Sequence, residues 1–88
     1  MSDWIYPEIV ESLKKSCSSF LGGEITVQDI QTQIYMAENQ IVALDEKWLR
    51  TLLFNAENEI ELLIYTTDES QLFNLVKPVV QNILSKVS

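Results

Sequence analysis

Apolar residues recur three or four positions apart in four successive stretches of the chain, the spacing of amphipathic helices. The first stretch runs from about Trp4 to Leu21. Pro7 suits the first turn of a helix, where a missing N–H costs nothing, and Gly22-Gly23 is predicted to close the helix in the left-handed conformation. The apolar positions of this helix are Ile9, Val10, Leu13, Cys17, Phe20 and Leu21.

The second predicted helix has a start signal in the sequence. Thr26 is placed as N-cap with Asp29 three residues later, a variant of the capping box, and Ile25 with Ile30 forms a hydrophobic staple. No glycine or proline marks its end between residues 36 and 45. Its apolar stripe consists of Ile30, Ile34, Ala37, Ile41 and Leu44.

The third helix is predicted to start at Asp45 as N-cap, with Leu44 and Leu49 as its staple. Glu46 and Arg50 have the spacing of a favourable ion pair on one helix. The apolar face, predicted to fade near residues 64–65, consists of Trp48, Leu49, Leu52, Leu53, Ala56, Ile60 and Leu63.

The fourth helix is predicted to start at Thr66 or Thr67, because Thr66 and Glu69 have capping-box spacing and Asp68 complements the helix dipole. Pro78 falls on the polar side, where a kink facing solvent is expected. The apolar arc consists of Leu72, Phe73, Leu75, Val76, Val79, Val80, Ile83 and Leu84.

These segments predict an all-α fold, a single domain over residues 1–88 folded as an antiparallel four-helix bundle, because the connections are short. A strand is the alternative for residues 57–65, where glutamates alternate with other residues. Three closely spaced glutamates disfavour that alternative.

Composition argues against catalysis. The chain has no histidine, which excludes Ser-His-Asp and Cys-His schemes, and its single Cys17 cannot complete a zinc site. We therefore expect no enzyme, no catalytic residues, no metal and no cofactor. Cys17 falls on an apolar face and is predicted to be a core residue. With one cysteine, no signal peptide and no apolar stretch that spans a bilayer, a cytoplasmic protein is expected.

The net charge of −7 favours a basic partner, because such a surface repels nucleic acid and anionic membranes. The charge concentrates between Glu57 and Glu69, which hold five acidic residues and no basic one. Two interpretations stay open: a solvated helix end, or a docking surface in which exposed aromatics lie beside uncompensated charge. The candidate partner-binding residues are Phe54, Glu57, Glu59, Glu61, Tyr65, Asp68 and Glu69.

Ser70 lies in a context that partly matches a carrier-protein motif. Acyl carrier proteins attach phosphopantetheine to a serine in an Asp-Ser-Leu context, but residues 68–72 read Asp-Glu-Ser-Gln-Leu. The aspartate is displaced and glutamine follows the serine, which disfavours a carrier protein.

Three segments carry a resemblance to a known family: residues 20–26 (FLGGEIT), 53–61 (LFNAENEIE) and 68–72 (DESQL). Over roughly Val10 to Leu84 the chain resembles the immunity proteins that protect bacteria from colicin D-type tRNA-cleaving toxins, including toxins of contact-dependent growth inhibition. That family has a longer acidic loop before the last helix, where this chain has the apolar residues 62–65.

The resemblance implies a four-helix bundle that plugs the basic tRNA-binding cleft of a toxin nuclease, with acidic side chains in place of RNA phosphates. The phosphate mimics would be Glu57, Glu59, Glu61, Asp68 and Glu69. The expected partner is thus a basic protein domain, and not nucleic acid, a membrane or a small-molecule substrate. The alternative is a non-catalytic helical adaptor, or small subunit of another assembly, that docks through the apolar arc around Phe73 and Val80.

Overall fold

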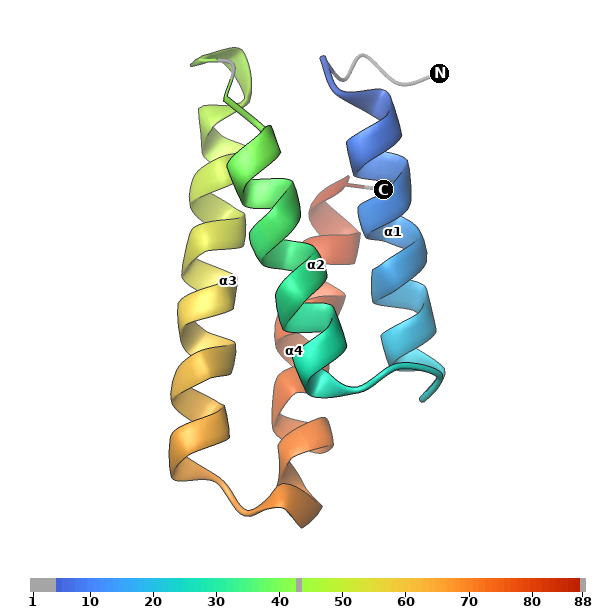
Figure 1. Cartoon of the computed structure of the whole chain (residues 1–88), viewed down its shortest axis with the longest axis vertical. Helices are drawn as coiled ribbons and strands as arrows, with labels where there is room; N and C mark the ends of the chain where they lie inside the picture. The colour runs from blue at the N-terminus through green and yellow to red at the C-terminus, as the bar shows by residue number, and fades with distance from the viewer. Residues whose placement is uncertain (1–4, 43, 88) are drawn as a thin grey trace.

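The computed structural model describes residues 5–42 and 44–87, and within them the protein is an all-α bundle of four helices without a strand (Figure 1). Successive helices run in opposite directions, so the predicted antiparallel four-helix bundle is confirmed. The elements are α1 (Pro7–Leu21), α2 (Val27–Gln40), the short 3-10 turn η1 (Leu44–Glu46), α3 (Lys47–Thr66) and α4 (Glu69–Val87).

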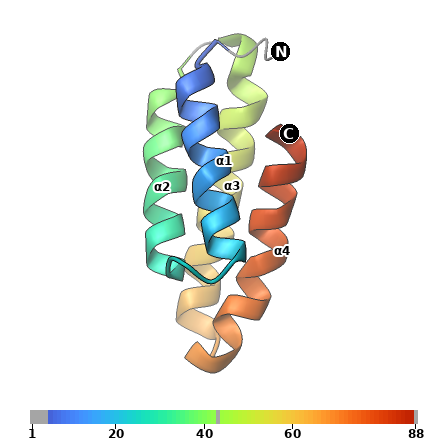
Figure 2. The ribbon, with the colours of Figure 1, turned by 90° about the vertical axis from the view of Figure 1, so that its right-hand side faces the viewer.

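Each helix packs against its neighbours in the chain, and α4 closes the bundle against α1. α1 and α3 lie at opposite corners, as the two perpendicular views show (Figures 1 and 2). No Cα atom of α1 comes within 8 Å of a Cα atom of α3. The outer faces of these two helices are therefore separate surfaces of the molecule.

The core is built from the predicted apolar stripes of all four helices, except that Trp48 and Leu75 of these stripes are 48% and 46% exposed. Phe20 is fully buried, and its ring centroid lies 4.9 Å from that of Phe73 on α4. The fully buried side chains with the largest volumes are Phe20, Ile30, Ile34, Ile41, Leu49, Leu53, Ile60, Ile83, Val10, Val76, Val80 and Val87. Cys17 is also fully buried, as predicted.

The connection between α1 and α2 follows the sequence signals. Gly23 has φ of 77°, and the Gly23 and Glu24 N–H groups donate to the carbonyls of Phe20 and Ser19 at 2.9 and 2.8 Å. This is a Schellman motif, so the predicted glycine stop is confirmed. The capping box is also confirmed, because the Thr26 hydroxyl and the Asp29 carboxylate each accept the other residue's N–H at 3.1 Å.

The predicted start of α3 is wrong. Asp45 lies inside η1, the helix begins at Lys47, and no side chain caps it. The staple is wrong as well, because Leu44 is 86% exposed. The reason is that Glu46 turns inward, where its carboxylate accepts the Ile5 N–H at 2.8 Å. Arg50, the residue expected to pair with Glu46, instead donates from Nε to the Glu38 carbonyl at 3.3 Å.

The predicted start of α4 is also wrong. Thr66 is the last residue of α3, and its hydroxyl donates to the Leu62 carbonyl at 2.8 Å, so it cannot cap α4, which begins at Glu69. The strand alternative fails because α3 continues through residues 57–65. Pro78 is exposed within a continuous helix, as its polar-side position predicted. α1 starts at Pro7, and the predicted start at Trp4 lies outside the described residues.

Candidate functional site

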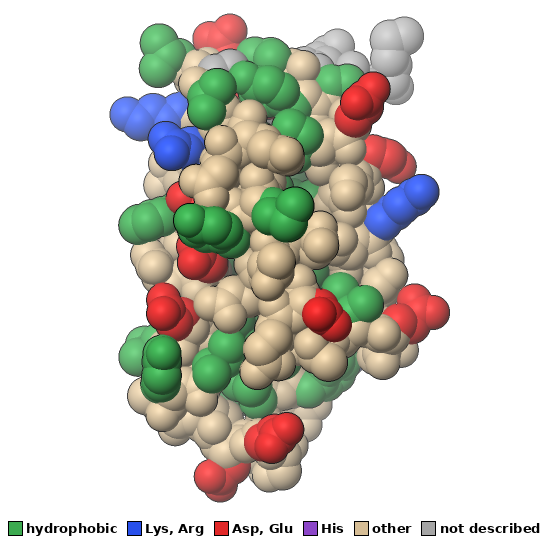
Figure 3. Space-filling model, viewed as in Figure 1, with side chains coloured by type: hydrophobic (Ala, Val, Ile, Leu, Met, Phe, Trp, Pro, Cys, Tyr) green, Lys and Arg blue, Asp and Glu red, His purple; other side chains and the backbone are tan. Residues whose placement is uncertain are grey.

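Four of the predicted partner-binding residues share one face of α3. Phe54, Glu57, Glu61 and Tyr65 follow each other at intervals of three or four residues, which places their side chains in one row. Phe54 is 49% and Tyr65 80% exposed, Glu61 is exposed and Glu57 is half-buried. We call this row the acidic face of α3. In Figure 3, acidic and hydrophobic side chains alternate down the edge of the molecule over lower α3.

The other three predicted residues lie elsewhere. Glu59 lines a separate hollow with Asn55 on α3 and Pro78 on α4. Glu69 lines a hollow at the lower end of the bundle, against the start of α2, and Asp68 is exposed in the connection before α4. The structure therefore divides the seven candidate residues among three places, of which the acidic face of α3 holds the largest group.

Charge is segregated along α3. Lys47 and Arg50 lie in its first turns, and no lysine or arginine occurs between residues 51 and 76. The lower end of the bundle, which holds the α1–α2 and α3–α4 connections, adds the exposed residues Glu24 and Asp29 to this region. Because no base is near in sequence on either connection, the lower half of the molecule carries an uncompensated negative field.

A functional candidate that sequence reasoning missed is Glu38 on α2. It is only 8% exposed, and its Oε1 atom is buried without a hydrogen-bond partner. A signal was present, because Glu38 follows Ile34 by four residues and precedes Ile41 by three, and both are fully buried. A charged residue at that position of an apolar stripe is unusual, since buried carboxylates are normally paired.

The Glu38 carboxyl group lies beside that of Glu57 across the α2–α3 interface. Burial raises the pKa of Glu57, and the negative charge of Glu38, a hydrogen bond with its carboxyl group and the charge of Glu61 raise it further. Two ionised carboxylates cannot hydrogen-bond to each other, so that bond exists only when one of them holds a proton. With both ionised, Glu38 Oε1 lacks a donor.

A surface hollow opens next to this pair between α2 and α3. It is lined by the side chains of Glu38, Lys47, Arg50, Thr51 and Phe54. The basic residues form its upper rim, and Arg50 already donates Nε to the main-chain carbonyl of Glu38. The hollow thus combines one carboxylate, that of Glu38, and the exposed ring of Phe54 with two basic side chains.

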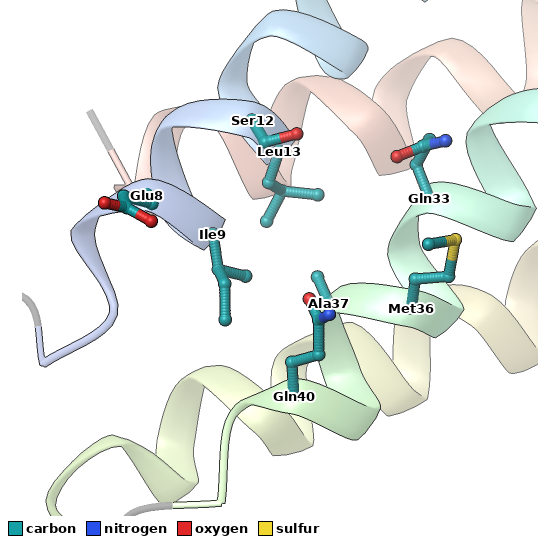
Figure 4. A pocket seen from close by; sticks show the side chains of 8 residues that line it. All are labelled: Glu8, Ile9, Ser12, Leu13, Gln33, Met36, Ala37 and Gln40. Atoms are coloured by element: carbon teal, nitrogen blue, oxygen red, sulfur yellow. The ribbon is translucent and has the colours of Figure 1, made fainter.

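The remaining features offer less chemistry. A groove between α1 and α2 is lined by Ile9, Leu13 and Met36 together with uncharged polar side chains and Glu8, which are spread along its rim (Figure 4). Burial raises the pKa of the Cys17 thiol to about 11, which makes it unreactive. Within residues 5–42 and 44–87, no three acidic or sulfur ligands cluster as a metal site would require, and no helix has the length and apolarity to cross a bilayer.

Comparison with known proteins gives no relative. No protein-family model matches the chain. No curated protein matches it, and no solved structure does. The resemblance to the colicin D-type immunity proteins therefore stays a prediction from the sequence.

Proposed function

We propose that this protein is not an enzyme and acts by binding a basic partner protein through the acidic face of α3. The observation that carries the proposal is the row of Phe54, Glu57, Glu61 and Tyr65, in which two exposed aromatic rings flank two carboxylates and no lysine or arginine follows Arg50 on α3. Aromatic side chains supply buried contact area in protein interfaces, and complementary charge speeds the encounter and fixes its register.

We propose further that the partner is the nuclease domain of a tRNA-cleaving bacterial toxin, and that the chain is its immunity protein in the cytoplasm. The resemblance of residues 20–26, 53–61 and 68–72 to colicin D-type immunity proteins supports this. A nuclease that binds tRNA needs a basic cleft, and a compact acidic helix face fits such a cleft.

The test is a charge reversal with a matched control. Glu57→Lys with Glu61→Lys changes the acidic face, whereas Glu8→Lys with Glu11→Lys makes the same change in net charge on α1, which does not contact α3. Against the nuclease domain of the toxin gene directly upstream, the α3 variant should lose roughly a hundredfold in affinity. The α1 variant should change little beyond a general electrostatic effect.

The cellular readout is growth while the toxin is expressed. The wild type and the α1 variant should protect, and the α3 variant should not, although circular dichroism should show it folded. If the folded α3 variant protects as well as the wild type, the acidic face is a solvated surface and the proposal is wrong.

The adaptor alternative loses the surface on which it depended. Val80 is fully buried, and Phe73 packs against Phe20 in the core. Most of the apolar arc of α4 packs into the bundle, and Leu75, at 46% exposed, is the part of it that remains open to a partner.

A further inference from the structure

The burial of Glu38 needs an explanation. Removing a carboxylate from water without a partner is strongly unfavourable, and folded proteins therefore supply a donor or neutralise the group. Glu38 lies on α2 in the same stripe as the fully buried Ile34 and Ile41. Its Oε1 nevertheless has no hydrogen-bond partner.

The nearest groups of the chain do not satisfy this carboxylate. Arg50 uses its Nε to bind the main-chain carbonyl of Glu38, not its carboxylate. Glu57, the closest acidic neighbour, adds a second negative charge. Lys47 and Arg50 of α3 line the surface hollow that leads to Glu38, but neither is hydrogen-bonded to its Oε1 atom.

We propose that this hollow binds the guanidinium group of one arginine side chain of the partner protein, with Glu38 and Glu57 as its acceptors. The exposed ring of Phe54 lines the same hollow, and Tyr35, three residues before Glu38 on α2, is 53% exposed on the same side of that helix. A planar guanidinium forms two parallel hydrogen bonds with carboxylates and stacks on aromatic rings, which an ammonium group does less well. This inference rests on the proposed function and names its central contact.

The surrounding charges define how the site responds to pH. The charged side chains around the site are Glu38 on α2 and four residues on α3. Lys47 and Arg50 lie at the upper rim, and Glu57 and Glu61 lie below. Below the raised pKa of Glu57, a proton on this residue relieves its repulsion with Glu38, and the guanidinium competes with that proton. Binding therefore strengthens as the pH rises, until Glu57 is ionised in the free protein, and then becomes constant.

The site can be tested without the partner. N-acetyl-arginine amide is titrated into the protein at constant ionic strength, with N-acetyl-citrulline amide as the uncharged analogue of the same shape and N-acetyl-lysine amide as the alternative cation. NMR shifts of the side-chain carboxyl carbons report on binding. We expect saturable arginine binding with a dissociation constant on the order of millimolar, centred on Glu38, Phe54 and Glu57. Citrulline should leave these signals unchanged, and lysine should bind more weakly.

Two variants sharpen the result. Glu38→Gln keeps the shape of the side chain and should weaken arginine binding about tenfold, whereas Glu11→Gln on the distant helix α1 should not. Phe54→Leu, at a half-exposed position that leaves the core intact, should weaken it about threefold. Arginine binding that is no stronger than lysine binding, or that Glu38→Gln leaves unchanged, would overturn the proposal.

The same variants separate this proposal from the proposed function. If the nuclease domain binds the acidic face but Glu38→Gln behaves like Glu11→Gln in that assay, the guanidinium site is wrong and the proposed function stands. If arginine amide binds at Glu38 but the nuclease domain does not bind at all, the proposed function fails and the guanidinium site remains.

Discussion

Two buried glutamates on either side of the α2–α3 connection differ in how their carboxylates are satisfied. Glu38 and Glu46 are 8% and 5% exposed, and each has an Oε1 atom without a hydrogen-bond partner. The second oxygen of Glu46 accepts the N–H of Ile5, which lies 41 residues away in sequence. Glu38 faces a second acid, Glu57, and a hollow open to solvent.

The difference is between a carboxylate that accepts a main-chain N–H and one that lies beside a second acid. Glu46 fixes the segment before α1 to the start of α3, so its burial contributes to the fold. Glu38 makes no comparable contact within α2 or α3 through its Oε1, and its proximity to Glu57 costs stability. The guanidinium proposed above would supply the donor that the Oε1 atom of Glu38 lacks.

The largest expected effect is the loss of stability when a core residue of α3 is truncated, compared with truncation of its exposed neighbour. Leu53 is fully buried and Phe54 is 49% exposed, although they are adjacent in sequence. Leu53→Ala should lower the free energy of unfolding by about 3 kcal/mol, because it leaves a cavity. Phe54→Ala should lower it by less than about 1 kcal/mol and act mainly on binding. Urea denaturation measures both, and equal losses of stability would show that Phe54 belongs to the core.

The next effect concerns Glu46. Glu46→Ala removes the acceptor of the Ile5 N–H and should lower the free energy of unfolding by about 1 kcal/mol. Glu46→Gln keeps an acceptor oxygen and should cost less. Thermal and urea denaturation of the two variants measure the difference. A Glu46→Ala protein that is more stable than the wild type would remove the contrast between the two glutamates.

Glu38 should respond in the opposite direction. Glu38→Gln removes the like charge beside Glu57 and should raise the free energy of unfolding at pH 7 by about 0.5 kcal/mol. Glu57→Gln should do the same, and the double variant should gain less than the sum, because the two single changes relieve one repulsion. A destabilised Glu38→Gln protein would mean that the carboxylate has a structural partner.

The smallest effect is a pH dependence carried by Glu57. Its pKa in the folded protein is raised by burial and by the Glu38 and Glu61 charges, so the folded state holds this proton more tightly than the unfolded state. The resulting stability is present below the unfolded pKa of about 4.3 and is lost as the pH rises through the folded pKa. Acidification from pH 7 to 5 should therefore stabilise the wild type relative to Glu57→Gln. Urea denaturation of both proteins over a series of pH values measures this difference. The same pH dependence of the unfolding free energy in both proteins would contradict the prediction.

Local sequence signals were predicted well because their partners are close in the chain. The glycine stop after α1 and the Thr26–Asp29 box use groups within a few residues of each other. The cap assigned to Asp45 failed because a distant contact decided it, the hydrogen bond from the Ile5 N–H to the Glu46 carboxylate. The cap assigned to Thr66 failed for a local reason, because Thr66 still belongs to α3 and its hydroxyl donates to the Leu62 carbonyl.

The same distinction applies to the candidate site. The row from Phe54 to Tyr65 follows from helical spacing alone, so the sequence was sufficient to propose it. The pairing of Glu38 with Glu57 depends on how α2 and α3 are aligned against each other, which no periodicity within one helix reveals. Glu59 was grouped with its neighbours in sequence, but on a helix a shift of two residues turns a side chain away.

The buried thiol of Cys17 has a consequence for measuring how often the bundle opens. Its sulfur is fully covered, and burial raises its pKa to about 11, so both access and ionisation prevent alkylation in the native state. A thiol reagent can modify the chain only during excursions that expose α1 to water. The rate at which Cys17 is modified therefore measures how often these excursions occur, without any added label. A ligand that stabilises the closed bundle should lower the modification rate of Cys17 in proportion to its occupancy.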